Sequence, residues 1–332
     1  MAAPHPAQLQ PSADRFWQHH WNDPRVVSYL EERFDLSKRT GVNVAKVELL
    51  GQVVREGETF LDVGCGPGRF FELTRPFGVK YTGVDVTPNM VARARRRYPD
   101  ADFRVDDAFR LSFEDGSFDV VFNNDVLRHV PQPAAIVSEL ARVARRQVVI
   151  MDFIHPTHET FLWYGPVVKE AEGFSLTYVR NRAEFEAILS SAGLVPTTVV
   201  ELATEEQGTH HAYLFDKALD RCRKGNEDFA RAELAAARRA YEEALRIDPA
   251  CAEALYNLGM ADLNEGRWDC AADHLSRAAA LRPEDGDFLK SLAVAELQHG
   301  RREAALATIE RYLALAPGDE KAIAFRDNLR HP

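Results

Sequence analysis

The chain has 332 residues, of which 45% are hydrophobic and 28% are charged, and its formal net charge is −10. This is the composition of a folded globular protein with a length typical of two domains, and it excludes a disordered or collagen-like chain. The excess of negative charge disfavours nucleic acid as a partner, because phosphate backbones would be repelled.

Localisation and metal content are predicted from what the sequence lacks. No apolar stretch approaches the roughly 18 residues that cross a membrane. The first residues lack the basic and apolar regions of a secretory signal. The four cysteines form no C-x-x-C pair, so they predict neither a disulfide framework nor a metal site. We therefore expect a cytoplasmic protein with no membrane partner and no bound metal.

The chain begins with a segment of low complexity. Residues 1–14 are rich in Pro, Ala and Gln, which predicts a disordered tail. Aromatic segments within residues 15–50 predict a helical lid ahead of a sheet. From residue 59 to about residue 150 apolar strands alternate with helices, which indicates a Rossmann-like, doubly wound α/β fold. We expect residues 15–217 to form this domain, closed by an antiparallel pair of strands.

Residues 61–70 read as a buried strand that breaks into a glycine turn and opens a helix. Gly64, Gly66 and Gly68 can adopt positive φ and leave backbone N–H groups open to a ligand. The dinucleotide-binding pattern G-x-G-x-x-G is not met, because Arg69 stands at the third glycine position. Asp62 at the strand end would repel a pyrophosphate, whereas it suits a ligand that bears an ammonium group.

Three further segments follow in a fixed order. A strand ends at Asp85, about 20 residues after the turn, where a doubly wound sheet places the carboxylate that accepts ribose hydroxyls. Residues 103–113 carry paired acids, and residues 118–130 read as an apolar strand with a polar turn. With the glycine turn, these segments resemble the class I methyltransferases that use S-adenosylmethionine (SAM), in particular the type 11 and type 25 domains. The resemblance implies SAM as the cofactor and methyl transfer as the activity.

The resemblance also implies individual cofactor contacts. Asp107 takes the position of the acid that bonds the adenine amino group, although Asp106 stands where the family often has glycine. Ser112 likewise stands where proline is frequent. The residues predicted to line the cofactor site are Asp62, Gly64, Cys65, Gly66, Gly68, Asp85, Val86, Asp106, Asp107, Ala108 and Asn123.

Candidates for the acceptor side lie after the fourth and fifth strands. Methyl transfer needs a nucleophile held in line and water excluded, and a base helps when the acceptor is a hydroxyl or an ammonium. His129 and His155 follow these strands at the sheet edge where open α/β folds bind ligands, so both are candidate bases. Packing under a substrate loop is the alternative role for His129. Aromatic residues that line an acceptor pocket or fill the core are Trp17, Trp21, Tyr29 and Tyr164.

After residue 217 the sequence changes to Ala, Leu, Arg and Glu at a helical period. Pro249, Pro283 and Pro317 are spaced by 34 residues (283 − 249 = 34; 317 − 283 = 34), a period that resembles tetratricopeptide (TPR) repeats. Residues 218–332 are therefore expected to form an all-α repeat module, with a degenerate first helix around residues 221–225. Such a module either binds a protein or peptide partner or serves packing and homodimer formation.

Three functions remain open at this point. The leading hypothesis is a methyltransferase that acts on O, N or C of a small molecule, with the repeats serving assembly or acting as a lid. The second is a peptide or protein methyltransferase whose repeats hold the substrate polypeptide. The third is a non-catalytic scaffold with a SAM fold. Nucleobase methylation is set aside, because the D/N-P-P-Y/F turn of those enzymes is replaced here by Asn-Asn-Asp-Val at residues 123–126.

Overall fold

A computed structural model describes residues 21–33, 41–155, 161–165, 175–205 and 208–330. The chain divides into two compact units, Met1–Phe215 and Asp216–Pro332. No helix in the described ranges is long and apolar enough to cross a membrane. The predicted tail at residues 1–14 lies outside the described part of the chain.

The first unit is built on a seven-stranded sheet with the order β3-β2-β1-β4-β5-β9-β8. β1 pairs in parallel with both β2 and β4, and β8 and β9 pair antiparallel at one edge. This order confirms the predicted doubly wound fold with its antiparallel closing pair. The strands are β1 (Thr59–Val63), β2 (Lys80–Asp85), β3 (Asp102–Val105), β4 (Phe118–Asn124), β5 (Ala144–Ile154), β8 (Thr198–Glu205) and β9 (Gly208–Asp216).

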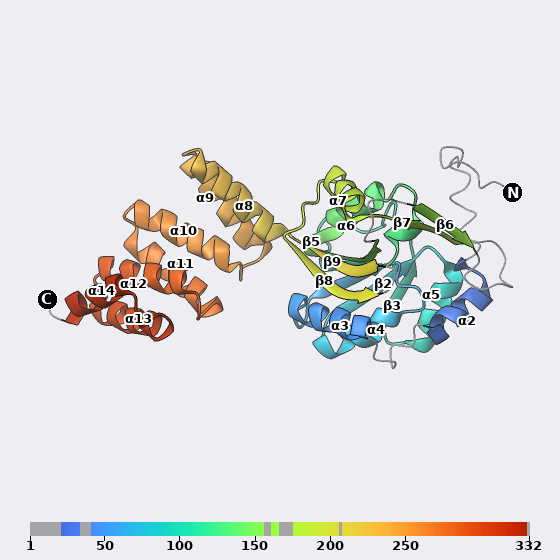
Figure 1. Cartoon of the computed structure of the whole chain (residues 1–332), viewed down its shortest axis with the longest axis horizontal. Helices are drawn as coiled ribbons and strands as arrows, with labels where there is room; N and C mark the ends of the chain where they lie inside the picture. The colour runs from blue at the N-terminus through green and yellow to red at the C-terminus, as the bar shows by residue number, and fades with distance from the viewer. Residues whose placement is uncertain (1–20, 34–40, 156–160, 166–174, 206–207, 331–332) are drawn as a thin grey trace. The chain divides into compact units, whose positions relative to one another are not determined.

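Helices cover both faces of this sheet (Figure 1), with α6 and α7 on one face and α3, α4 and α5 on the other. Adjacent strand residues point into different cores: Phe60 packs with Val120 in one, and Leu61 packs with Val121 in the other. Burial on both faces explains why these strands read as continuous apolar runs. The helical elements are α2 (Pro24–Arg33), α3 (Gly41–Val53), α4 (Arg69–Thr74), η3 (Arg75–Phe77), α5 (Pro88–Arg97), η4 (Leu127–His129), α6 (Ala134–Val143) and α7 (Arg182–Ser191).

A second, two-stranded sheet was not expected from the sequence. β6 (Phe161–Gly165) and β7 (Ser175–Val179) pair antiparallel, with Phe161 opposite Val179. The sequence indicated only an aromatic crossover in this region. Each strand is five residues long, and an apolar run of that length does not by itself distinguish a strand from other buried segments.

The second unit consists, within its described residues, of paired helices. Its predicted all-α repeat architecture is confirmed, and each 34-residue copy is a helical hairpin. The helices are α8 (Lys217–Ala230), α9 (Leu234–Ile247), α10 (Ala252–Asn264), α11 (Trp268–Leu281), α12 (Gly286–Gln298), α13 (Arg302–Leu315) and α14 (Glu320–Arg330).

The first repeat helix is regular, which corrects the expectation of a degenerate helix around residues 221–225. α8 has 14 residues and is capped at its start by the Asp216 side chain. A Cβ added at Gly225 would lie 2.4 Å from the Tyr241 ring, and one at Gly259 would lie 2.5 Å from Leu275. Each glycine therefore allows its helix to pack closely on the next one. Because Gly225 and Gly259 are 34 residues apart (259 − 225 = 34), Gly225 marks the first copy of the repeat.

Candidate functional site

The glycine turn after β1 has the backbone that the sequence requires. Gly64, Gly66 and Gly68 have φ values of 77°, 54° and 83°. A Cβ at Gly64 would lie 2.2 Å from Val126, and one at Gly68 would lie 2.8 Å from Phe103. A Cβ at Gly66 would meet nothing within 4 Å. Gly64 and Gly68 therefore let the turn pack closely against Val126 and Phe103. Gly66 is the glycine whose backbone a ligand can approach.

Asp85 stands beside this open glycine at the end of β2. One carboxylate oxygen accepts a hydrogen bond from the Gly66 N–H at 3.0 Å. The other accepts from the Thr87 N–H at 2.9 Å and from the Thr87 hydroxyl at 2.5 Å. Burial raises the pKa of Asp85, and the hydrogen bonds from Thr87 and Gly66 oppose that rise. The site thus joins an open backbone and a fixed carboxylate, which fits a ligand with vicinal hydroxyls.

Asp62, near the end of β1, is buried and bonded within the fold. It is 1% exposed, and its Oδ2 accepts a hydrogen bond of 2.6 Å from the Tyr81 hydroxyl. Burial raises the pKa of Asp62 to about 7, although the Tyr81 hydrogen bond opposes the rise. Tyr81 thus takes up one carboxylate oxygen of Asp62, and the contact of Asp62 with a ligand ammonium stays a prediction.

This burial makes a prediction about the pH dependence of stability. The pKa of Asp62 is higher in the fold than its ordinary value of 3.8, so Asp62 stabilises the fold at low pH and loses that contribution as the pH rises through about 7. Asp62→Asn removes the titration and keeps an acceptor for Tyr81. In thermal melts between pH 5 and pH 8, the melting temperature of Asp62→Asn should rise relative to the wild type as the pH increases. A difference in melting temperature that stays constant between pH 5 and pH 8 would contradict this prediction.

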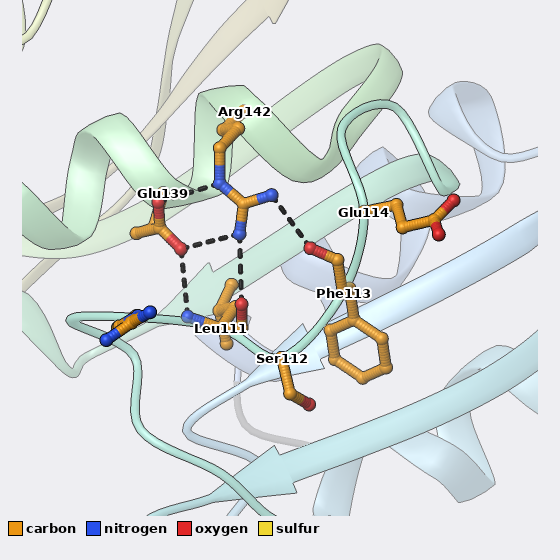
Figure 2. Close-up of a pocket in the computed structure, with 7 residues that line it drawn as sticks. Leu111, Ser112, Phe113, Glu114, Glu139 and Arg142 are labelled. Carbon is orange, nitrogen blue, oxygen red and sulfur yellow. Dashed lines mark hydrogen bonds and ion pairs between the residues drawn. The ribbon is translucent and has the colours of Figure 1, made fainter.

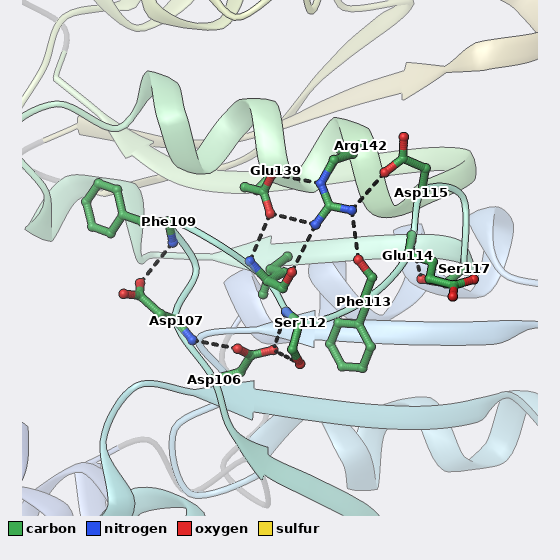
Figure 3. A network of polar contacts seen from close by, with 11 residues as sticks. Asp106, Asp107, Phe109, Ser112, Phe113, Glu114, Asp115, Ser117, Glu139 and Arg142 are labelled. Carbon is green, nitrogen blue, oxygen red and sulfur yellow. Dashed lines mark hydrogen bonds and ion pairs between the residues drawn. The ribbon is translucent and has the colours of Figure 1, made fainter.

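The loop after β3 holds the predicted adenine-side acids. The backbone N–H of Asp106 donates to the Asp85 carbonyl at 3.1 Å, which ties this loop to the end of β2. Asp106 Oδ2 accepts from the Ser112 N–H at 3.0 Å and from its hydroxyl at 2.8 Å. Asp107 is exposed, and its Oδ1 accepts from the Phe109 N–H at 2.9 Å. Figure 3 shows Asp106 inside the loop, so Asp107 is the acid that remains available to a ligand.

Two side chains of α6, Arg142 and Glu139, hold the same loop through hydrogen bonds, and we call this pair the clamp. Arg142 donates to Glu139, to the backbone carbonyls of Leu111 and Phe113, and to Asp115, at distances from 2.7 to 3.0 Å. Glu139 accepts in turn from the Leu111 N–H at 2.8 Å. Figure 2 shows the contacts of Arg142 and Glu139 with Leu111 and Phe113, beside a hollow of about 550 Å³ between α6 and the loop, and Figure 3 adds the contact with Asp115. No residue of the glycine turn lines that hollow, so the hollow is separate from the turn.

The clamp leads to a prediction for cofactor binding. Arg142→Gln removes the ion pair with Glu139 and most of the bonds to the loop, so the segment from Asp106 to Asp115 should loosen. We expect SAM affinity in calorimetry to fall roughly tenfold, equivalent to about 1.4 kcal/mol. Arg145→Gln is the matched control, because Arg145 bonds Gly116 and Asp119 instead of this segment. Equal SAM affinity in the two variants would contradict the clamp.

The remaining predicted cofactor residues lie at the carboxyl end of the central strands. Cys65 is buried, with its Sγ 3.6 Å from the Gly66 carbonyl, and acts as packing under the turn. Asn123 is fully buried and donates to the Val63 carbonyl at 2.9 Å, which joins β4 to β1. Val86 and Ala108 are half-buried, each next to one of the acids just described.

On the acceptor side the structure brings two predicted residues together. The Trp21 and His129 rings meet edge to face with their centroids 4.8 Å apart. His129 Nδ1 lies 3.5 Å from the hydroxyl of Thr177 on β7. His155 instead bonds through its backbone N–H to the Arg180 carbonyl at 3.0 Å. Tyr29 lies on α2 and Tyr164 on β6, whereas Trp17 and the Tyr164 side chain lie outside the described part.

A charged cluster at the end of β4 was not predicted from the sequence. Lys46 of α3 is buried and donates to Asn124 at 2.6 Å and to Asp125 at 3.2 Å. Burial would raise the pKa of Asp125, but the positive charges of Lys46, Arg128 and His210 hold it well below its usual range. The polar run directly after an apolar strand was the available signal, whereas its partner Lys46 lies almost 80 residues earlier in the chain.

Comparison with known proteins gives the two units their families. Residues 61–151 match the family model of a methyltransferase domain, and residues 225–266 and 256–320 match models of tetratricopeptide repeats. The chain carries a methyltransferase domain and a TPR module. The methyltransferase match covers all the segments that carry the glycine turn, Asp85 and Asp107.

Relatives of the methyltransferase domain include two enzymes of quinone chemistry. The 2-methyl-6-phytyl-1,4-hydroquinone methyltransferase of Synechocystis is 34% identical over 173 residues, which cover 46% of this chain and 54% of the relative. A demethylmenaquinone methyltransferase of Beutenbergia cavernae is 38% identical over 119 residues, which cover 35% of this chain and 49% of the relative. The chain thus spans about half the length of these curated relatives.

A solved structure shows the same fold as the methyltransferase domain. The 1,6-didemethyltoxoflavin-N1-methyltransferase of Burkholderia thailandensis superimposes with a TM-score of 0.50 at 19% sequence identity. The match covers 65% of this chain and 93% of that enzyme. At this identity the likeness concerns the fold alone.

Proposed function

We propose that residues 15–217 bind SAM and transfer its methyl group to a small-molecule acceptor. The observation that carries this proposal is the pairing of Gly66 with Asp85: an open, positive-φ backbone whose N–H is held 3.0 Å from a carboxylate at the end of the neighbouring strand. SAM offers ribose hydroxyls for the carboxylate and no phosphate for it to repel. The family match over residues 61–151 supports the same reading.

When bound, SAM would supply a methyl group already activated by its positively charged sulfur. The chain's own residues then have three tasks. Gly64–Gly68 and Asp85 hold the cofactor, and Asp107 is placed for the adenine. Trp21 and His129 line the space for the acceptor at the end of β4, where they help to exclude water. The ion pair of Lys46 with Asp125 joins α3 to the end of β4, and the lid predicted for residues 15–50 would include this helix.

A small acceptor is favoured over a polypeptide by the nature of the relatives, whose names specify quinols and other small molecules. For residues 218–332 we propose protein contacts, either with a partner or with a second copy of the chain, because TPR modules present stacked helical hairpins for such contacts. A peptide methyltransferase, with the repeats holding the substrate, is the second candidate. A non-catalytic scaffold is the third.

Labelling separates these functions. The full chain is incubated with methyl-labelled SAM and an extract of the organism that encodes it, and the label is measured in the small-molecule and protein fractions. We expect S-adenosylhomocysteine to form and the label to appear in the small-molecule fraction. Label confined to protein would favour the peptide methyltransferase, and no turnover with any fraction would favour the scaffold.

A further inference from the structure

Asp152 is a buried carboxyl near the carboxyl end of β5 that the cofactor site does not use. The residue is 1% exposed. Its Oδ1 accepts a hydrogen bond from the Phe153 N–H at 2.8 Å. Its Oδ2 is buried and has no hydrogen-bond partner among the described residues. A carboxylate oxygen without a donor in the interior is costly, so its retention requires a reason.

Arg128 in η4 presents the complementary group. Its Nε is buried and likewise has no acceptor within the described ranges. Its Nη1 lies 3.5 Å from Asp125, and its guanidinium lies over the Phe153 ring, 5.2 Å from the centroid. Because Phe153 follows Asp152 directly, these contacts hold Arg128 at the same end of β5.

The surroundings of Asp152 set its proton affinity. Burial, together with the nearby negative charge of Asp125, raises the pKa of Asp152 to about 6. The positive charges of Arg128 and Arg180 oppose that rise, with Arg128 the larger of the two. On β9, burial raises the pKa of Tyr213, and the negative charge of Asp152 adds a smaller part of that rise. Asp152 is thus a carboxyl that can hold or release a proton near neutral pH.

Asp152 and Arg128 lie at the acceptor side of the sheet. β4 and β5 pair in parallel with Asn124 opposite Met151, and β1 with its glycine turn lies on the other side of β4. The Asp125 N–H donates to the Met151 carbonyl at 2.9 Å, so the residues after β4 lie beside the last residues of β5. Ligands of open α/β sheets bind outside this edge. The pair is therefore near the cofactor turn but separate from it.

We propose that Asp152 and Arg128 together bind a hydroxyl group of the methyl acceptor, and that Asp152 removes its proton. A hydroxyl accepts a hydrogen bond from Nε–H and donates one to Oδ2 at the same time. An ammonium offers no acceptor to Arg128, and an ether or carboxylate offers no proton to Asp152. This inference rests on the proposed methyl transfer and adds the chemical class of the acceptor.

The step balances in atoms and electrons. The acceptor oxygen forms a bond to the methyl carbon as the carbon–sulfur bond breaks, and the electron pair of that bond stays on sulfur, which becomes neutral. The hydroxyl proton passes to Asp152 Oδ2 and is later released to solvent. The products are a methyl ether and S-adenosylhomocysteine.

The test uses the full chain, SAM with a ¹³C-labelled methyl group and the small-molecule fraction of the same extract. Nuclear magnetic resonance of the labelled product should show the methyl group on oxygen. With the purified acceptor, wild-type kcat/KM should rise with pH through about 6 and then level off, because the base acts when deprotonated. Asp152→Asn should lower kcat by about 10²- to 10⁴-fold and remove this rise, with SAM affinity unchanged within about twofold.

Two further variants keep the inference falsifiable if Asp152→Asn folds poorly. Arg128→Lys keeps a positive charge near Asp125 but lacks Nε–H, so KM for the acceptor should rise while SAM affinity stays the same. Glu296→Gln is the matched control, because Glu296 also has a buried oxygen without a described partner but lies in the TPR module. A methyl group on nitrogen or carbon, or an unchanged pH profile in Asp152→Asn, would overturn the inference while the methyltransferase proposal stands. Absence of turnover in the wild type would overturn both.

Discussion

Asp85→Ala is expected to weaken SAM binding by at least about 100-fold. The carboxylate holds the Gly66 N–H and the Thr87 turn, and it is the group placed for the ribose hydroxyls. A hydrogen bond to a charged group contributes about 1.5–3 kcal/mol, so the loss of two contacts to the ligand accounts for this factor. Isothermal titration calorimetry of SAM into the full chain measures it directly.

The control for Asp85→Ala is Asp100→Asn, since Asp100 is an exposed acid of the same unit that pairs with Arg75 on the surface. Asp100→Asn should bind SAM as the wild type does. Asp85→Asn should be intermediate, because an amide oxygen still accepts one hydrogen bond. Wild-type affinity in Asp85→Ala would remove Asp85 from the cofactor site.

The second large effect is expected for Gly66→Ala, which should abolish SAM binding without unfolding the protein. The φ of 54° at Gly66 costs an alanine about 1–2 kcal/mol, but the new methyl group meets no protein atom within 4 Å. It occupies the space through which a ligand reaches the backbone. Calorimetry should therefore show no detectable SAM binding, while thermal unfolding should remain a single transition of the domain at a slightly lower temperature.

Gly193→Ala separates backbone strain from blocked access. Gly193 has a φ of 78° and also has open space around it, but it follows α7 away from the turn. We expect the two variants to lose similar stability, and only Gly66→Ala to lose SAM. Equal SAM affinity in both variants would show that the ligand does not approach Gly66.

The cofactor half of the site was predictable because its chemistry is local in the chain. The positive-φ glycines and the acid at the end of the next strand lie within one βαβ unit, so spacing alone brings Gly66 and Asp85 together. The same holds for the repeats, whose 34-residue period directly reflects one helical hairpin. Gly225 follows the same period, since it stands 34 residues before Gly259, so the first repeat helix is also marked by a local pattern.

The acceptor half was not predictable in the same way. Lys46 reaches Asn124 across 78 positions, and the pairing of Trp21 with His129 joins segments more than 100 residues apart. Asp152 lay within a strand that reads as apolar, and a single acid there indicates neither burial nor a missing partner. These features depend on how distant elements pack, which no local pattern encodes.

The central claim is that SAM binds on the glycine turn after β1, and a crystal structure of the full chain with S-adenosylhomocysteine tests it most directly. The account predicts that the ribose hydroxyls lie within hydrogen-bond distance of Asp85, that the ligand contacts the backbone of Gly66, and that the adenine lies beside Asp107. Ligand density elsewhere, for example in the hollow between α6 and the loop from Arg110 to Glu114, would contradict it.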